Sequence, residues 1–331
     1  MNEKTMDVLA IGNAIVDVIT DSNDAFLSSL GMAKGSMRLI DAGEAERLYA
    51  AMGPGREASG GSAANTVAGL AALGLRTAFV GQLGDDDLGK IFAHDIRSLG
   101  VDFRTPPSAD AGATARCLIL VTPDAQRTMN TFLGAAQHLD KSAIEPRAIA
   151  AARIIYLEGY LWDPEQPRAA MEAAIDFARS AGTKVAFTLS DGFVVERHRN
   201  DFLRLIDEGK IDILFANEQE FLHLAEGIEL ISAIDDFAKK VPILVVTRSE
   251  HGALACRGEE RAHVPAEPIE KLVDTTGAGD LFAAGFLAGQ ARGRSLEDSL
   301  RLGAIAASEV IQHYGARPEL DLAALAGPLL R

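Results

Sequence analysis

The residues best suited to chemistry lie in the stretch 274–280, DTTGAGD, which runs directly into LFAAGFLAGQARG, a nearly uncharged segment with helical spacing. Gly277 and Gly279 allow the backbone to turn tightly and present its N–H groups, and the following helix points the positive end of its dipole at the same place. The stretch therefore predicts an anion site at Gly277, Ala278 and Gly279. Asp280, directly after it, is placed to accept a proton from a hydroxyl group that attacks the bound anion. This combination is typical of phosphoryl transfer.

Three other patterns bear on this interpretation. In a purely structural alternative, Asp274 caps the helix and the glycines relieve crowding. The stretch GDDDLGKI at 84–91 matches part of a P-loop, but Ile91 stands where the magnesium-binding Ser or Thr belongs, and three aspartates would repel a phosphate. We interpret it as the acidic first turn of a helix. No G-x-G-x-x-G follows a predicted strand, which argues against a dinucleotide-dependent oxidoreductase.

Composition excludes several classes of partner. The 331 residues, 48% hydrophobic and 24% charged, predict a soluble globular protein with one large core and a small accessory layer. The net charge of −15 and the lack of a Lys/Arg cluster argue against a nucleic-acid or anionic-membrane partner. A bound phosphate must therefore be held by local dipoles, a metal or a few basic side chains. No apolar run approaches the roughly 20 residues needed to span a bilayer.

The cysteines and the N-terminus indicate a cytoplasmic protein. Cys117 and Cys256 lie far apart in apolar, strand-like runs, so we expect buried thiols in a reducing cytosol. The N-terminal stretch mixes acidic residues into its apolar run and lacks a basic head and a cleavage site. It therefore predicts a first strand rather than a signal peptide. The sequence does not decide between a monomer and a homodimer.

Short β-branched runs alternate with amphipathic helical stretches along the chain. This order predicts an α/β fold, a parallel sheet covered by helices on both faces. The predicted strands are 7–11, 77–80, 154–157, 185–189, 211–215 and 243–247, and the predicted helices are 62–73, 88–99, 168–181, 200–208 and 218–226.

Two segments break this alternation. Residues 14–40 and 113–132 contain alternating, hairpin-like strands without room for long helices between them. We expect them to pair into a small β-sheet lid inserted in a single domain that spans residues 1–331, because such a flap is suited to cover a cleft.

Three motifs in order resemble the ribokinase, or PfkB, family of carbohydrate and nucleoside kinases. They are GGSAAN at 60–65, NEQE at 217–220 and DTTGAGD at 274–280. The resemblance extends over essentially the whole chain. It implies a Rossmann-like domain with a β-sheet lid that transfers the γ-phosphoryl group of ATP to a substrate hydroxyl.

The resemblance also assigns roles to residues. It makes Asp280 the base and Gly277 to Gly279 the anion hole, and it makes Asn217 and Glu220 the residues that organise Mg²⁺, mostly through water. From the residues alone, an Asn N-cap with a Glu three positions later is an equal alternative. Thr247 and Gly252 match the adenine-nucleotide pocket, although the intervening RSEH departs from the family pattern. Family members often bind a monovalent cation, K⁺ among them, near the aspartate that Asp274 matches.

The acceptor site is predicted from the other end of the chain. In GNAIVDVI, period-two alternation places Asn13 and Asp17 on one strand face, and a carboxylate there can accept hydrogen bonds from two adjacent hydroxyls of a sugar. A solvated lid face is the alternative. Gly60 and Gly61 would let the sugar approach the backbone, and Asn65 would face it. Arg127 is expected to meet phosphate or substrate, or to pair with a carboxylate.

Within this family, five stretches are most similar to adenosine kinases: GNAIVD, YLEGYLWDPE, TLSDGF, DILFANE and GARPE. The resemblance thus implies phosphorylation of adenosine to AMP, with a ribokinase- or fructokinase-like sugar kinase as the alternative. Tyr160-Leu161-Trp162 is not a straight match to the family's nucleoside-stacking aromatics. A sensor without catalysis is the third possibility, but such a protein needs neither Asp280 nor Glu220.

Overall fold

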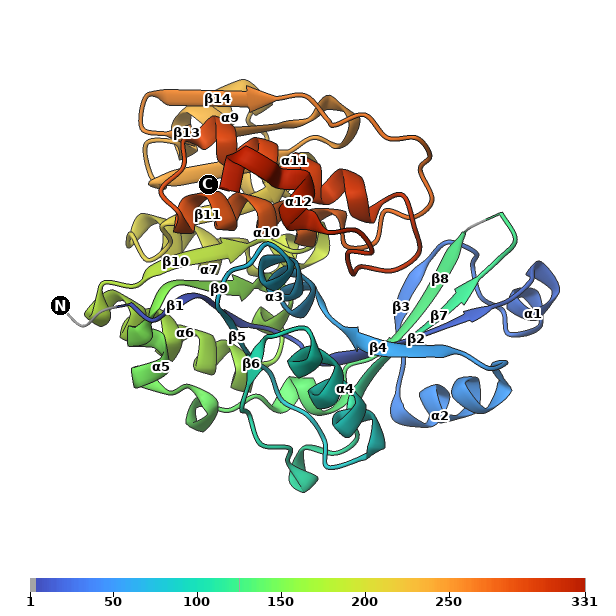
Figure 1. Cartoon of the computed structure of the whole chain (residues 1–331). Helices are drawn as coiled ribbons and strands as arrows, with labels where there is room; N and C mark the ends of the chain where they lie inside the picture. The colour runs from blue at the N-terminus through green and yellow to red at the C-terminus, as the bar shows by residue number, and fades with distance from the viewer. Residues whose placement is uncertain (1–3, 125, 331) are drawn as a thin grey trace.

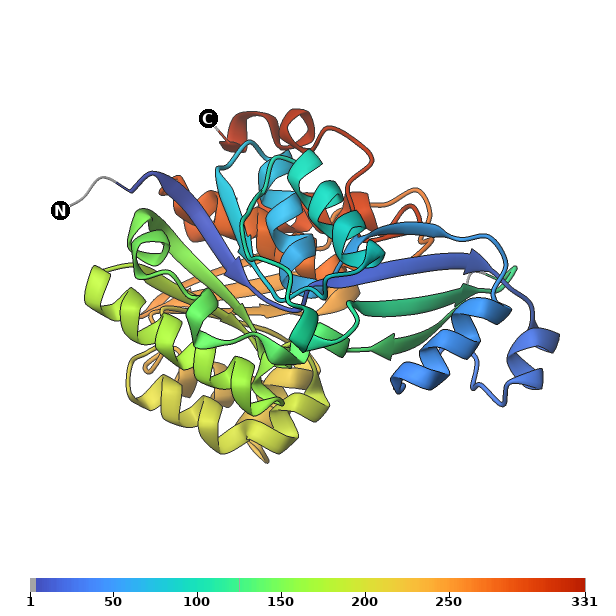
Figure 2. The same ribbon diagram turned by 90° about the horizontal axis from the view of Figure 1, so that it is seen from below.

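The first two strands of the chain, β1 (Met6–Ile11) and β2 (Ile15–Asp21), belong to two different sheets (Figure 1). The computed structural model describes residues 4–124 and 126–330, so 1–3, 125 and 331 lie outside it, position 125 within the predicted segment 113–132. Over the described residues, nine strands form a large sheet and five form a small one. Figure 2 shows the small sheet projecting from one side of the large one.

The large sheet is mostly parallel. Its strand order is β14-β13-β12-β11-β10-β9-β1-β5-β6, with only the β12–β13 and β13–β14 pairs antiparallel. All six predicted core strands are confirmed to within two residues. The strands besides β1 are β5 (Thr77–Val80), β6 (Asp102–Phe103), β9 (Ala152–Glu158), β10 (Lys184–Thr188), β11 (Ile213–Asn217), β12 (Ile243–Thr247), β13 (Ala253–Arg257) and β14 (Glu260–Val264).

Helices cover both faces of the large sheet, as predicted. In β1, Val8 and Ala10 face one hydrophobic cluster while Leu9 and Ile11 face the other. The first cluster includes α3 (Ser62–Ala72), α4 (Asp87–Ser98), α10 (Ala278–Ala291), α11 (Leu296–Val310) and α12 (Leu322–Ala326); the second includes α5 (Pro146–Ala151), α6 (Glu165–Ala181), α7 (Gly192–Asp207), α8 (Glu218–Ala225) and α9 (Leu230–Phe237). No helix among these is long and apolar enough to cross a membrane.

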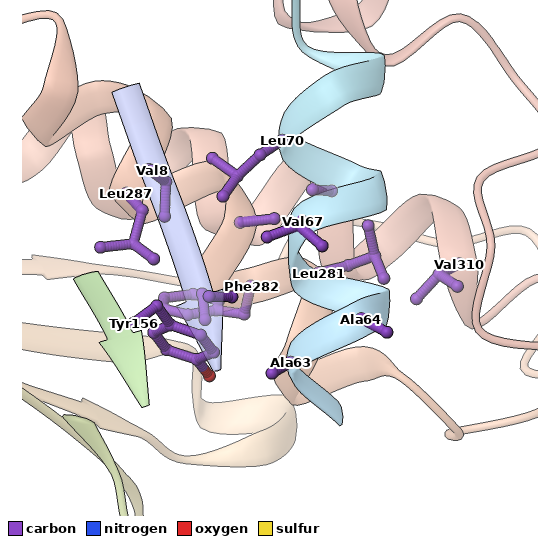
Figure 3. Packing of buried hydrophobic residues seen from close by; sticks show 14 of the residues in the cluster. Val8, Ala63, Ala64, Val67, Leu70, Tyr156, Leu281, Phe282, Leu287 and Val310 are labelled. Atoms are coloured by element: carbon purple, nitrogen blue, oxygen red, sulfur yellow. The ribbon is translucent and has the colours of Figure 1, made fainter. Parts of the chain in front are cut away.

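The packing of α3 against α10 positions the site described below. Figure 3 shows Val67 and Leu70 of α3 beside Val8 of β1 and near Leu281 of α10. Both helices are rich in alanine and glycine, so their backbones approach closely. The N-terminal ends of α3 and α10 consequently lie next to each other.

Two helices differ from or refine the predictions. We expected α7 to begin at Asn200, but it begins at Gly192, because the Asp191 side chain caps it by accepting from the backbone N–H of Phe193. A non-helical residue, His198, interrupts the helix and hides its periodicity in the sequence.

The stretch GDDDLGKI is confirmed as an acidic first turn, since Asp86 caps α4 by accepting from the N–H of Gly89.

The small sheet has the order β3-β8-β7-β2-β4. Four of its strands come from the predicted segments, namely β2, β3 (Met37–Leu39), β7 (Ala115–Val121) and β8 (Arg127–Phe132). The fifth, β4 (Arg56–Gly60), lies outside them, because REASG contains no β-branched residue and carries no strand signal. Two helices, α1 (Asp24–Ser29) and α2 (Ala42–Ala51), accompany this sheet.

Candidate active site

Asp280 lies in the first turn of α10 and faces the first turn of α3. Its carboxylate accepts hydrogen bonds from Ser62 Oγ at 2.6 Å and from Asn65 Nδ2 at 2.9 Å. Burial raises the pKa of the Asp280 carboxyl, while these two hydrogen bonds and the positive charge of Arg317 limit the rise. A raised pKa makes this carboxylate a better proton acceptor, and both of its oxygens are held in position. Asn65, expected to face the substrate, donates from Nδ2 to Asp280 and also lines the acceptor pocket described below.

The start of α10 has the geometry expected of an anion site. Gly277 precedes the helix with a φ of +78°, and a Cβ there would lie 2.6 Å from the Cβ of Ala316, so only glycine fits. No side chain of the described residues caps this helix end, and Gly279 is exposed. The N–H of Ala278 donates to the carbonyl oxygen of Thr275 at 3.2 Å, whereas the N–H of the exposed residue Gly279 is oriented by the helix and open to a ligand.

Two segments that connect the small sheet to the large body lie beside the N-terminus of α10. The chain passes from β1 to β2 through Asn13, and from β4 to α3 through Gly60 and Gly61. A Cβ on Gly61, whose φ is +96°, would collide with the carbonyl oxygen of Asn13, and a Cβ on Gly60 would collide with the carboxylate of Asp17. These glycines therefore have a packing role in addition to the ligand approach that the sequence predicted.

Glu158, at the end of β9, accepts hydrogen bonds from both of these connecting regions. Its carboxylate accepts from the backbone N–H and the side-chain Nδ2 of Asn13 at 2.7 and 2.6 Å, and from the N–H of Ala63 at 2.8 Å. Complete burial raises the pKa of Glu158 to about 7, against the lowering effect of these hydrogen bonds. Glu158 belongs to none of the predicted site motifs; its only signal in the sequence is a carboxylate that directly follows the apolar run IIYL.

A pocket lies between the small sheet and the C-terminal loops, with Asp17 on its wall. Burial raises the pKa of Asp17 to about 6, although the charges of Arg317 and Arg127 oppose the rise. The lining residues are Asp17, Ile19, Arg56, Ala58, Ser59, Asn65, Arg127, Thr276, Tyr314, Gly315, Ala316, Arg317, Pro318 and Glu319. The predicted acceptor residues Asp17, Asn65 and Arg127 thus share one pocket, whereas Asn13 turns its amide toward Glu158.

Arg317, in the GARPE stretch, is a second residue that sequence reasoning did not single out. It donates to the carbonyl oxygens of Ala64 and Ser59 at 2.8 and 2.7 Å, and burial lowers its pKa to about 10 while Asp17 opposes the change. Its guanidinium charge therefore acts on both the predicted acceptor residue Asp17 and the candidate base Asp280. Nothing in the local sequence marks this role, because it depends on partners more than 250 positions away.

Arg127 and Asp274 form a buried ion pair. The distance between Arg127 Nη2 and Asp274 Oδ2 is 2.7 Å, and only 6% and 4% of the two side chains are exposed. Arg127 Nη1 also donates to Thr276 Oγ1 at 3.2 Å. The expectation that Arg127 pairs with a carboxylate is thus confirmed, and the carboxylate belongs to the DTTGAGD loop itself.

Asn217 and Glu220 form the capping box that the sequence left as an alternative. Asn217 Oδ1 accepts from the N–H of Glu220 at 2.8 Å, and the Glu220 carboxylate accepts from the N–H and Nδ2 of Asn217 at 3.0 and 2.7 Å. Burial raises the pKa of Glu220 to about 7, and the charges of Asp191 and Asp280 add to the rise. Because these carboxylates repel one another, a divalent cation near them would be favoured. No three His, Cys, Asp or Glu side chains gather to ligate a metal in the described part of the chain, so magnesium would be held here through its water shell.

The predicted nucleotide residues lie next to this pair. Thr247 at the end of β12 is the register partner of Asn217 at the end of β11, so both stand at the carboxyl edge of the large sheet, where ligands of open α/β sheets bind. Gly252 has a φ of +80° and no room for a Cβ. Arg248, in the stretch that departs from the family pattern, donates to Glu218 at 2.7 Å.

The aromatic residues of the stretch 160–162 separate into two environments. Trp162 is completely buried between Phe187 and Phe202, and its Nε1 donates to Asp201, so it is unable to stack on a ligand. Tyr160 is 36% exposed.

The two groups of predicted residues both act electrostatically on Tyr160. Burial raises the pKa of its hydroxyl above the usual range, and negative charges from both groups, Asp280 and Glu220 among them, add to the rise. The base and the expected magnesium organisers are therefore close enough to interact electrostatically.

A model of the pfkB family carbohydrate kinases matches residues 37–322. The chain belongs to this family. It is therefore a phosphotransferase that acts on a hydroxyl group, with ATP as co-substrate, and the ribokinase-like fold predicted from the sequence is confirmed.

Solved structures and a curated relative refine the similarity. This kinase is 48% identical to a probable sugar kinase from Rhizobium etli, with a TM-score of 0.91 and 98% of each chain covered. It is 49% identical to adenosine kinase from Sinorhizobium meliloti, with a TM-score of 0.90 and 97% and 98% of the two chains covered. Adenosine kinase from Saccharomyces cerevisiae is 26% identical over 336 residues, covering 94% of this kinase and 96% of that protein.

The raised pKa of Glu158 predicts a pH-dependent stability. Because the folded-state pKa of Glu158 is about 7 and the ordinary pKa of a glutamate is 4.5, its contribution to stability is fully present below about pH 4.5 and is lost as the pH rises through 7. Glu158→Gln cannot lose a proton. We expect its free energy of unfolding, relative to the wild type, to rise by on the order of 3 kcal/mol between pH 4.5 and 8.

Urea unfolding of both proteins at several pH values measures this difference. The other buried carboxyl groups titrate in both proteins, so their effect cancels in the difference between the two free energies of unfolding. Glu259→Gln, in an exposed turn, is the matched control and should keep the wild-type pH dependence. Parallel pH curves for Glu158→Gln and the wild type would show that Glu158 is ionised throughout this range.

Proposed function

We propose that this kinase phosphorylates adenosine to AMP with ATP and magnesium. The observation that carries the proposal is the 49% identity to an adenosine kinase over 97% of the chain. The pocket beside Asp280 supports it, since the Asp17 carboxylate can accept hydrogen bonds from the two adjacent hydroxyls of a ribose. The similarity to a probable sugar kinase favours a free sugar as the second candidate.

The residues present divide the reaction among themselves. Asp280 accepts the proton of the acceptor's primary hydroxyl as its oxygen forms a bond to the γ-phosphorus of ATP. The bond from that phosphorus to the bridging oxygen breaks, and its electron pair leaves with ADP. The N–H groups at Gly277, Ala278 and Gly279 stabilise the charge on the transferred phosphoryl oxygens.

The nucleotide side of the cleft is proposed on the same basis. Thr247 and Gly252 would hold the adenine nucleotide, and Asn217 and Glu220 would hold magnesium through its water shell. When bound, magnesium offsets the phosphate charge, which this acidic chain otherwise balances with few basic groups. Both cysteines are free and buried, which supports the cytoplasm as the place of action.

The acceptor is identified by ADP release from ATP with and without magnesium. We expect turnover with adenosine to exceed that with other nucleosides, ribose, fructose and keto-deoxy sugars. Turnover with a free sugar but not with adenosine would establish the second candidate. If none of these acceptors leads to ADP release, the result would favour a sensor that has retained the fold.

Asp280→Asn tests the base. The substitution preserves size and removes proton acceptance, so we expect kcat to fall by roughly 10²–10⁴ while the Kd for ATP is unchanged. Stopped assays give kcat and calorimetry gives the Kd. Near-normal turnover by the pure variant would remove Asp280 from the reaction.

Asp17 provides a test of acceptor recognition. Because its pKa is about 6, ionised Asp17 is lost as the pH falls through 6, and the KM for adenosine should rise there while the KM for ATP does not. Asp17→Asn should raise the KM for adenosine roughly 10- to 100-fold at pH 8, the value of a charge-assisted hydrogen bond, and should abolish its pH dependence near 6. Equal changes in both KM values would place Asp17 outside the acceptor site.

A further inference from the structure

The oxygens of the Asp274 carboxylate already have partners within the chain. Oδ1 accepts from the N–H of Thr276 at 3.0 Å. Oδ2 accepts from the N–H of Gly315 at 3.1 Å and lies 2.7 Å from Nη2 of Arg127. The carboxylate thus joins three segments: the DTTGAGD loop, the loop that follows α11, and strand β8 of the small sheet.

A monovalent cation does not fit at this carboxylate. Such an ion needs several oxygen ligands and a net negative surrounding, but the N–H groups of Thr276 and Gly315 already donate to these oxygens, and the Arg127 guanidinium charge lies 2.7 Å from Oδ2. The ion pair is almost completely buried, so water screens little of the repulsion between Arg127 and a second cation. The ring of Tyr314 packs against the guanidinium, 5.6 Å from its Cζ, and confines it further.

We propose that the Arg127 guanidinium supplies the positive charge that family members obtain from a monovalent cation, so that this kinase requires no K⁺. Arg127 neutralises Asp274 from one side and binds Thr276 Oγ1 from the same guanidinium. Both contacts act on the loop that presents Gly277 to Gly279. Arg127 therefore fixes the loop from within the chain, as a bound ion would from solution.

The position of Arg127 gives this arrangement a property that a dissociable ion lacks. Arg127 begins β8 of the small sheet, whereas Asp274 precedes α10 of the large body. The charge therefore reaches the loop only when the small sheet is packed as in this structure. The same ion pair therefore has two consequences. The charge at the loop does not depend on the cation in solution, and it does depend on the packing of the small sheet.

The wild type provides the first test. At constant ionic strength, chloride salts of K⁺, Na⁺, Cs⁺ and tetramethylammonium are compared for kcat/KM with the best acceptor and for the melting temperature Tm without substrates. We expect kcat/KM to vary less than twofold and Tm to be the same in all four salts. Activation of severalfold by K⁺ over tetramethylammonium, or a K⁺-specific rise in Tm, would overturn the proposal.

Removing Arg127 is the second test. In Arg127→Ala we expect kcat/KM to fall at least tenfold in tetramethylammonium and to recover partly with K⁺ or added guanidinium, with a saturable K⁺-dependent rise in Tm. Arg127→Lys retains the charge and should remain insensitive to K⁺. A folded Arg127→Ala variant that responds to no cation, in activity or in Tm, would show that Arg127 does not replace an ion.

Arg116→Ala is the matched control. Arg116 is on the neighbouring strand β7, and its guanidinium lies over the rings of Tyr49 and Phe132, away from Asp274. It should be as insensitive to K⁺ as the wild type. The turnover measurements rest on the proposed function, whereas the Tm measurements need no substrate, so failure of the proposed acceptor and failure of the ion-replacement idea give different results.

Discussion

The site depends on how the chain satisfies the N-terminus of α3. This helix has no capping side chain of its own, because Gly61 stands at the N-cap. Glu158 accepts from the N–H of Ala63 on one side, while Ser62 and Asn65 donate to Asp280 on the other. The first turn of α3 is therefore held between the buried carboxylate of Glu158, which also bonds to Asn13, and the half-buried carboxylate of Asp280, which is suited to remove a proton.

Several carboxylates lie near one another in partly or fully buried positions, which disfavours their charged forms. Such a cluster indicates where the functional site lies. Burial raises the pKa of Glu158 and Glu220 to about 7 and that of Asp17 to about 6, which means that the fold disfavours the charged form of each group. Buried Arg127 and half-buried Arg317 provide only part of the compensation. Clusters of this kind are typical of catalytic sites, where perturbed groups are retained for chemistry rather than for stability. The helix dipole of α10 is then suited to accommodate the phosphates of ATP.

The sequence predicts the large sheet and the candidate base better than it predicts the contacts between them. Period and composition suffice for strands such as β1 and β12, because each is buried by its own apolar run, and the glycines of DTTGAGD reveal a helix start by their spacing. Strand β4 carries no such pattern. Glu158 and Arg317 escape prediction for a different reason: their partners lie far away in the chain, and only the folded structure brings a lone charged residue to a helix end.

Arg127 and Asp274 were predicted separately but not as a pair, because they too are far apart in the chain. Each belongs to a recognisable segment, yet the segments join only because the small sheet packs over the start of α10. Asp17 comes from this small sheet, while the base and the anion site come from the large body. Any movement that separates the two parts must break a buried ion pair and expose both charges. The predicted acceptor pocket, the ion pair at Asp274 and the predicted anion loop are thus properties of one packed arrangement.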